Sequence, residues 1–247
     1  MNKIKMQSYV KRLENKIFKI ILPKNRYLKW AWDNETISAN WYTSVRQNPE
    51  HDLRRPVYKE FFESIKSNLS NSKSLGIDLG CGDFRITEYL LKECPGANFL
   101  GIDFSTISNI SSSKIKKKYN NVDFINANVT NTSNWIPNVN ARYGEYKTVI
   151  FTYGCLTYLS GKELKDLYLA LHNIRNLECI ISIEPIEKIY HDQIVTKKVE
   201  SSFRHNYSVY LTEAGYDLKQ YQFLFDSRDN VFMIAVPNTN HKGLNNG

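Results

Sequence analysis

The sequence predicts an α/β fold with a mostly parallel sheet and helices on both of its faces. Short apolar runs alternate with segments of helical spacing along most of the chain, and this alternation is typical of a parallel sheet. The chain has 247 residues, of which 42% are hydrophobic, which is enough for one large core. We expect a ligand site at the carboxyl ends of the strands, where such folds bind their ligands.

Each predicted element follows from the spacing of its apolar residues or from the Gly, Pro and turn residues at its ends. Ser160 and Glu163 are spaced as a capping box, which predicts the start of a helix that extends to Arg175. The Asn-rich residues 131–143 are expected to form a loop. Helices are predicted at residues 57–65, 84–91, 105–119, 160–175 and 207–215. Strands are predicted at residues 75–79, 97–103, 122–126, 146–152, 179–184, 216–226 and 230–236.

Residues 74–84, with the sequence SLGIDLGCGDF, are the stretch around which the chain is organised. Residues 75–79 read as a buried strand, Gly80 and Gly82 form a turn, and residues 84–91 have helical spacing. A glycine turn lets a ligand approach the backbone closely, and the start of the next helix presents unpaired N–H groups. The stretch therefore predicts the binding site of a nucleotide-like cofactor.

Two cofactor classes compete for this turn. A nicotinamide or flavin site requires G-x-G-x-x-G, and Arg85 occupies the position of the third glycine. The chain instead has Asp78 two residues before Gly80, and Asp103 at the end of the second predicted strand. This combination resembles motif I (D-x-G-x-G) and motif II of the class I S-adenosylmethionine (SAM) methyltransferases. The family usually has a further glycine where Phe84 stands.

The resemblance covers residues 40–236 and implies the Rossmann-like class I methyltransferase fold, a seven-stranded, mostly parallel sheet with helices on both faces. It also implies SAM as the cofactor. We expect the terminal pair of strands to complete the sheet. The expected organisation is a basic amphipathic arm at residues 1–30, a lid and helical segment at 31–70, the SAM-binding domain at 71–237 and a flexible tail at 238–247.

The resemblance assigns roles to the residues at the strand ends. Gly80 and Gly82 would admit the methionine and ribose portions of SAM, and Asp78 would hold the turn and attract the ammonium group. Asp103 would accept both ribose hydroxyls, because a carboxylate matches a vicinal diol; its alternative role is a helix N-cap. The expected cofactor-binding residues are Asp78, Gly80, Gly82, Asp103, Phe104, Asn128, Val129 and Thr152.

Three of these residues are expected near the two ends of the cofactor. Phe104 would stack near the adenine. Asn128 stands where similar enzymes have an acid for the adenine amino group, and its side-chain oxygen can accept that hydrogen bond. Thr152 ends the fourth predicted strand, beside the methyl group to be transferred.

Methyl transfer from SAM depends mainly on positioning, but an oxygen or nitrogen acceptor also needs a base. His191 and His205 are the candidate catalytic residues, because both precede the last predicted helix in a region that often closes over the substrate. Glu184, at the end of the fifth strand, is a third candidate. A solitary histidine is more often a surface or core residue. The spacing of the four Cys residues shows no metal pattern, so we expect no metal.

The charge lies almost entirely in the amino-terminal arm. Residues 1–30 contain seven lysines, two arginines and one glutamate, so the arm has a net charge of +8 and accounts for that of the whole chain. The neutral remainder argues against a large nucleic-acid footprint. Three roles stay open for the arm: packing on the body or on a partner protein, binding anionic lipid, or, least favoured, contacting nucleic acid.

The composition also indicates a cellular location. No run of about 18 apolar residues exists, so we expect no membrane span, and no apolar run is long enough for a signal peptide. The four cysteines lack C-x-x-C spacing and are interpreted as reduced thiols, with Cys81 a small filler rather than a nucleophile. We expect a cytoplasmic protein whose arm can contact the inner membrane surface.

The leading hypothesis is a SAM-dependent methyltransferase acting on the oxygen or nitrogen of a small molecule, such as a sugar or surface-glycan precursor. The first alternative is an RNA or protein methyltransferase that captures its substrate with the basic arm. The second is a non-catalytic partner subunit with the SAM fold. The chain lacks the Asn/Asp-Pro-Pro-Tyr/Phe signature of enzymes that methylate exocyclic base amines.

Overall fold

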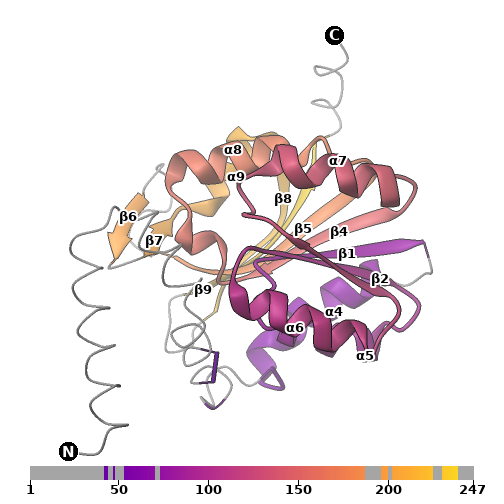
Figure 1. The fold of residues 1–247 in the computed structure, drawn as a ribbon. Coiled ribbons are helices and arrows are strands. Elements are labelled where there is room, and N and C mark those ends of the chain that lie inside the picture. The colour runs from indigo at the N-terminus through magenta and orange to yellow at the C-terminus, as the bar shows by residue number, and fades with distance from the viewer. Residues whose placement is uncertain are drawn as a thin grey trace, which may run out of the picture.

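The computed structural model describes residues 42–43, 47, 53–69, 73–186, 196–199 (backbone only), 202–224 and 230–238. Figure 1 shows a twisted sheet between two layers of helices. The strands are β1 (Ser74–Leu79), β2 (Asn98–Asp103), β3 (Val122–Asn126), β4 (Lys147–Tyr153), β5 (Leu177–Pro185), β6 (Thr196–Val199), β7 (Ser202–His205), β8 (Tyr216–Leu224) and β9 (Asn230–Pro237). The helices are α4 (Pro56–Asn68), α5 (Arg85–Glu93), α6 (Thr106–Lys116), α7 (Thr132–Tyr143), the 3₁₀ turn η2 (Leu156–Tyr158), α8 (Gly161–Leu171) and α9 (Tyr207–Glu213).

The main sheet has seven strands in the order β3-β2-β1-β4-β5-β9-β8. Strands β1 to β5 pair in parallel, and β9 lies antiparallel between β5 and β8. The predicted seven-stranded, mostly parallel sheet and its terminal strand pair are confirmed. All six residues of β1 are buried because helices cover both faces of the sheet.

Each face of the sheet carries its own apolar cluster. On one face, Trp135 of α7, Leu167 of α8 and Tyr210 of α9 pack against the sheet. On the other face, Phe61 of α4 and Leu90 of α5 do the same. Figure 1 shows α7, α8 and α9 along one side and α4, α5 and α6 along the other. The helices therefore leave the carboxyl ends of the parallel strands as the place where a ligand can enter.

The prediction of a loop at residues 131–143 is wrong, because this segment forms helix α7. Pro137 lies inside the helix and removes one backbone donor. Trp135 and Val139 are nonetheless buried in the core, and the indole N–H of Trp135 donates to the carbonyl of Val129 at 3.2 Å. Burial of one helical face outweighs the weak local preference of an Asn-rich sequence.

The predicted capping box at the start of α8 is confirmed. The backbone N–H of Ser160 donates to Glu163 Oε2 at 2.7 Å, and the backbone N–H of Glu163 donates to Ser160 Oγ at 3.3 Å. The helix ends at Leu171, four residues before its predicted end. Neither strand of the small sheet of β6 and β7 was predicted, since each has only four residues.

Several predictions fall outside the described residues, namely those for the arm at residues 1–30, for His191 and for the end of the tail. Among the helices that the structure describes, none combines the length and the apolar character needed to cross a membrane.

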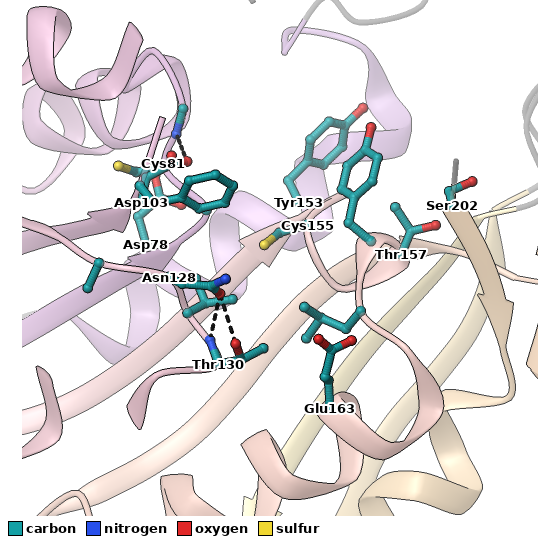
Figure 2. A pocket seen from close by; sticks show the side chains of 18 of the residues that line it. Asp78, Cys81, Asp103, Asn128, Thr130, Tyr153, Cys155, Thr157, Glu163 and Ser202 are labelled. Atoms are coloured by element: carbon teal, nitrogen blue, oxygen red, sulfur yellow. Dashed lines mark hydrogen bonds between the residues drawn. The ribbon is translucent and has the colours of Figure 1, made fainter. Parts of the chain in front are cut away.

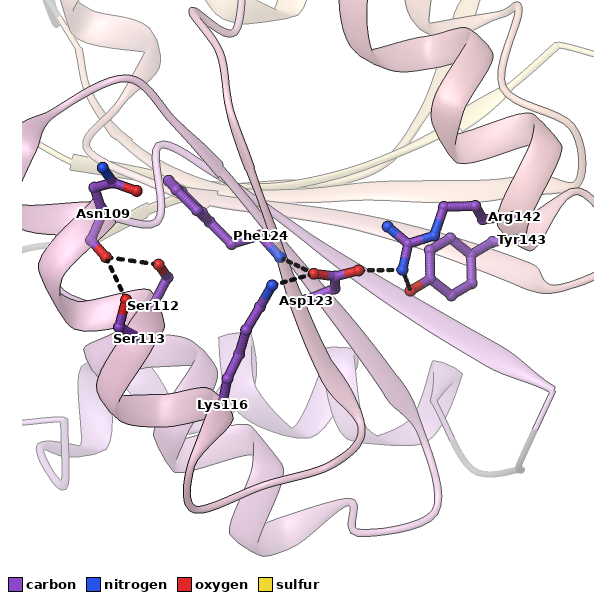
Figure 3. A network of polar contacts seen from close by, with 8 residues as sticks. All are labelled: Asn109, Ser112, Ser113, Lys116, Asp123, Phe124, Arg142 and Tyr143. Atoms are coloured by element: carbon purple, nitrogen blue, oxygen red, sulfur yellow. Dashed lines mark hydrogen bonds and ion pairs between the residues drawn. The ribbon is translucent and has the colours of Figure 1, made fainter.

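A polar network fastens helices from opposite faces to the edge strand β3. Asp123 of β3 accepts hydrogen bonds from Lys116 of α6, Arg142 of α7 and the backbone N–H of Phe124 (Figure 3). Partial burial alone would raise the pKa of the Asp123 carboxyl, but the bonds from Lys116, Phe124 and Arg142 outweigh it and lower the pKa. The ionised carboxylate is therefore the form that stabilises this edge.

We predict that Asp123→Asn lowers the free energy of unfolding at neutral pH by about 1 kcal/mol, or the melting temperature by about 2–4 °C. Because the folded pKa is lowered, the contribution of Asp123 is present at neutral pH and is lost as the pH falls through that pKa. The difference between wild type and variant should therefore shrink in acid. Thermal unfolding across a pH series measures it, with the exposed Glu145→Gln as control; a difference independent of pH would contradict the prediction.

Candidate functional site

A cavity of about 1160 Å³ lies at the carboxyl ends of the parallel strands. It brings together residues that are far apart in the sequence, including most of the predicted cofactor-binding residues. The predicted residues that line it are Asp78, Gly80, Gly82, Asp103, Phe104, Asn128 and Val129. Figure 2 shows Asp78, Cys81 and Asp103 at one end of the cavity, and Thr157 and Ser202 at the other.

Neither of the two glycines of the turn has room for a side chain. Gly80 has a φ of 73° and Gly82 a φ of 52°, in the left-handed region that favours glycine. A Cβ on Gly80 would lie 2.7 Å from Cβ of Cys155, and a Cβ on Gly82 would lie 2.6 Å from Cζ of Tyr42. The turn is therefore bare backbone, packed against Cys155 and Tyr42.

Phe84 occupies the position of the third family glycine without disturbing the turn. It keeps the left-handed conformation, with a φ of 63°, at a cost of about 1 kcal/mol for a residue with a side chain. Its ring is buried against β2, where a Cβ on Gly101 would lie 2.6 Å from Phe84 Cε1. Gly101 thus makes room for the ring, and α5 starts directly after Phe84, at Arg85.

Asp103 joins the end of β2 to the glycine turn. One carboxylate oxygen accepts the N–H of Gly82 at 3.0 Å, and the other accepts the N–H of Ser105 at 2.7 Å. Each oxygen has a further lone pair available for a ligand hydroxyl. The N-cap of α6 is Ser105, whose side chain accepts the N–H of Ser108, so the alternative role of Asp103 as the N-cap is excluded.

Asp78 is buried at the end of β1 and accepts the hydroxyl of Thr87, in α5, at 2.6 Å. Burial raises the pKa of Asp78 to about 7, and the nearby Asp103 carboxylate acts in the same direction. Asp78 therefore fastens the strand to the helix on the far side of the turn.

The side-chain oxygen of Asn128 is already occupied. It accepts the backbone N–H of Thr130 at 3.0 Å and the hydroxyl of Thr130 at 2.9 Å (Figure 2). Because an N–H can only donate, the oxygen and not the amide nitrogen must face Thr130. The hydrogen bond expected from an adenine amino group to this oxygen would therefore compete with the two bonds from Thr130. The N–H₂ group of Asn128 can instead donate to a ring nitrogen.

Thr152 lies behind the cavity wall and does not line the cavity. Its hydroxyl donates to Glu184 at 3.0 Å, and Glu184 also accepts the backbone N–H groups of Cys155 at 3.2 Å and Thr157 at 3.3 Å. Burial raises the pKa of Glu184 to about 7. Glu184 does not line the cavity either, so the geometry makes it a residue that positions the segment after β4 rather than a base.

The structure does not bring His205 into the cavity. His205 is fully buried, and its Nε2 lies 2.9 Å from the carbonyl oxygen of Leu159. Its ring packs against Tyr207 and Tyr210. This environment is that of a core histidine, which was the alternative interpretation of the residue.

Burial raises the pKa of both thiols at the cavity, Cys81 and Cys155. A Cβ on Gly101 would lie 2.7 Å from Cys81 Sγ, so this sulfur packs closely on β2. A buried, protonated thiol is a poor nucleophile. The interpretation of Cys81 as a small filler agrees with this packing.

Sequence reasoning gave no role to Tyr153, which lines the cavity at the end of β4. Its hydroxyl lies 2.9 Å from that of Tyr58 in α4, and the two rings pack edge to face. Its position directly after a predicted parallel strand was the one sequence feature that indicated a place at the site. No local pattern pointed to its partner, which lies 95 positions away in the sequence.

The sequence matches no protein-family model and no curated protein. Solved structures nevertheless resemble the chain. Magnesium protoporphyrin IX methyltransferase from Synechocystis PCC 6803 has a TM-score of 0.60 at 12% identity, over 87% of this chain and 100% of that protein. Geranyl diphosphate C-methyltransferase from Streptomyces coelicolor A3(2) has a TM-score of 0.58 at 13% identity, over 87% and 98%. The chain has the class I methyltransferase fold.

The class I fold alone does not specify a reaction. The [4+2]-cyclase SpnF shares it with a TM-score of 0.63 at 11% identity, over 88% of this chain and 97% of that protein. The function therefore depends on the residues of the cavity.

We predict that Gly82→Ala lowers the free energy of unfolding by about 1–2 kcal/mol, because a left-handed backbone is strained by any side chain and Tyr42 must move. Gly96→Ala is the matched control, since a Cβ there meets nothing within 4 Å. Urea denaturation measures both variants, and equal stability of the two would show that the turn tolerates a side chain.

We also predict that Asp78→Asn weakens the pH dependence of stability. Because the folded pKa is raised from 3.8 to about 7, the contribution of Asp78 is fully present below pH 3.8 and is lost as the pH rises through about 7. Stability should therefore fall less in the variant than in wild type over this range. Denaturation of both proteins at several pH values measures the effect. The exposed Asp166→Asn is the control, and parallel curves for wild type and Asp78→Asn would refute the prediction.

Proposed function

We propose that this protein is a SAM-dependent methyltransferase that transfers a methyl group to an oxygen or nitrogen atom of a small molecule. The observation that carries the proposal is the carboxylate of Asp103, held at the cavity by the N–H groups of Gly82 and Ser105. Bare glycine backbone and a fixed carboxylate on the neighbouring strand are the features that a nucleoside with a vicinal diol requires.

The residues present fit this cofactor. Gly80 and Gly82 leave the backbone open where a side chain would otherwise fill the space. Asp103 would accept the ribose hydroxyls through its remaining lone pairs. Phe104 and the Asn128 amide would contact the adenine from the neighbouring wall, which both residues line.

SAM, when bound, supplies a methyl group that is already activated by its sulfonium. The protein must then orient the acceptor and exclude water. Tyr153, Cys155, Thr157 and Leu159 line one wall of the cavity, and the acceptor would bind against this wall. The backbone bonds from Cys155 and Thr157 to Glu184 keep that wall fixed, and a fixed wall is what an in-line transfer needs.

A small acceptor is favoured by two observations. The chain outside residues 1–30 is neutral overall, so it has no general excess of positive charge to attract a nucleic acid. The similar enzymes named above act on a porphyrin and on geranyl diphosphate. A sugar or glycan precursor remains our proposed class of acceptor. His191 remains the proposed general base, outside the described residues.

We predict that the purified full-length protein binds SAM and S-adenosylhomocysteine in calorimetric titrations. Asp103→Ala should weaken both by roughly 100-fold, since it removes two charge-assisted hydrogen bonds of about 1.5 kcal/mol each. Asp166→Asn, which removes an exposed carboxylate of α8, should bind like wild type. Absence of heat in the folded wild-type protein would refute the proposed cofactor site.

Release of S-adenosylhomocysteine in the presence of candidate acceptors, with sugars tested first, then measures turnover. Cofactor binding without turnover on any acceptor would favour a non-catalytic partner subunit. Turnover of RNA or protein that weakens steeply with salt, and that depends on residues 1–30, would favour the macromolecular alternative.

A further inference from the structure

One guanidinium nitrogen of Arg204, a half-buried residue of β7, is buried without a visible partner. Arg204 lines the cavity, and its Nη1 nitrogen is buried and makes no hydrogen bond in the part of the chain that the structure describes. An arginine guanidinium keeps its positive charge in proteins. A buried, unpaired polar nitrogen of this kind is costly, so a native structure needs a reason to hold one.

The backbone around Arg204 is fixed on both sides. The hydroxyl of Thr157, in η2, donates to the carbonyl of Phe203 at 2.7 Å. The ring of His205 lies 2.9 Å, through Nε2, from the carbonyl oxygen of Leu159. Because side chains alternate along a strand, Arg204 points away from the side chains of Phe203 and His205. These two contacts therefore hold Arg204 at a set place in the cavity wall.

Two described carboxylates near the segment after β4 are engaged with other partners. Glu184 accepts its hydrogen bonds from Thr152 and the segment after β4. Glu163 accepts from the backbone and hydroxyl of Ser160. The hydroxyl of Tyr207 interacts electrostatically with Arg204 and is itself buried and without a hydrogen-bond partner in the described part of the chain.

The strand that carries Arg204 begins at the end of the cavity opposite Asp78 and Asp103. Arg204 follows Ser202 by two positions on β7, and Figure 2 shows Ser202 beside Thr157, at the opposite end from Asp78 and Asp103. A charge carried by this strand is better placed for a second ligand than for the ribose or the glycine turn. It can serve the second molecule that a methyltransferase must bind.

We propose that the acceptor substrate carries an oxyanion, a carboxylate or a phosphate, and that Arg204 binds it. The inference rests on the proposed function and specifies its substrate class. The planar guanidinium matches two oxygens of such a group, and a hydrogen bond to an ionised group in a buried site is among the stronger polar contacts. Binding the anionic end at β7 would direct the other end of the acceptor toward Tyr153 and Cys155.

The test measures the melting temperature of the full-length protein, with and without S-adenosylhomocysteine, during titration with sodium phosphate or sodium acetate. Sodium chloride at equal ionic strength is the reference. Wild type should be stabilised by at least one of the two oxyanions beyond chloride, because a ligand that binds the folded state raises the melting temperature. Arg204→Gln should lose this response, and Arg204→Lys should keep part of it.

Lys162→Gln is the matched control, since it removes an exposed positive charge of α8 outside the cavity lining, and it should respond like wild type. A response to phosphate alone or to acetate alone supports the proposal and identifies the anion. No response beyond chloride in wild type, or an equal response in Arg204→Gln, would overturn it.

Calorimetry with S-adenosylhomocysteine separates this inference from the proposed function. Arg204→Gln should bind the cofactor product like wild type, because the strand that carries Arg204 begins at the other end of the cavity. Absence of cofactor binding in all variants would refute the proposed function. The anion response would then test only whether Arg204 binds an oxyanion. If Arg204→Gln does not fold, the comparison of wild type with Arg204→Lys decides, and a full wild-type response in the lysine variant would contradict recognition by the guanidinium fork.

Discussion

The carboxylate of Asp103 is the contact on which the rest of the site depends. It ends β2, accepts the N–H of Gly82 from the turn after β1, and accepts the N–H of Ser105 at the start of α6. Three elements therefore meet at one side chain. Since backbone donors in a turn need acceptors when they are buried, the carboxylate fixes the shape of the turn before any ligand arrives and still presents lone pairs to the cavity.

Glu184 repeats this arrangement at the other side of the cavity. It is buried at the end of β5 and accepts backbone N–H groups from the irregular segment after β4. Two buried acids thus hold two loops at the same edge of the sheet, and only Asp103 lines the cavity. The two residues differ because they occupy different faces at their strand ends. Asp103 can therefore bind a ligand, whereas Glu184 can only position the cavity wall.

Much of the fold and part of the site could be predicted from the sequence. The apolar spacing of β1, the glycine turn and the strand-ending acids are local features, so Asp78, Gly80, Gly82 and Asp103 were placed together correctly by the rule that parallel strands end at one edge. Helix α7 could not be predicted in this way. Its Asn-rich sequence has little helical preference, and burial of Trp135 decides its conformation.

The sequence by itself determined the alternation of strands and helices and the position of the glycine turn, because both follow from short-range pattern. Only the tertiary structure decided the direction of side chains at the strand ends. The side chains of Thr152 and His205 both point into the protein. Thr152 donates a hydrogen bond to Glu184, and His205 lies beside the carbonyl oxygen of Leu159. Arg204, which no pattern singled out, took a place in the cavity wall because contacts from Thr157 and Leu159 fix the strand that carries it. Such contacts join residues more than thirty positions apart, and no local spacing encodes them.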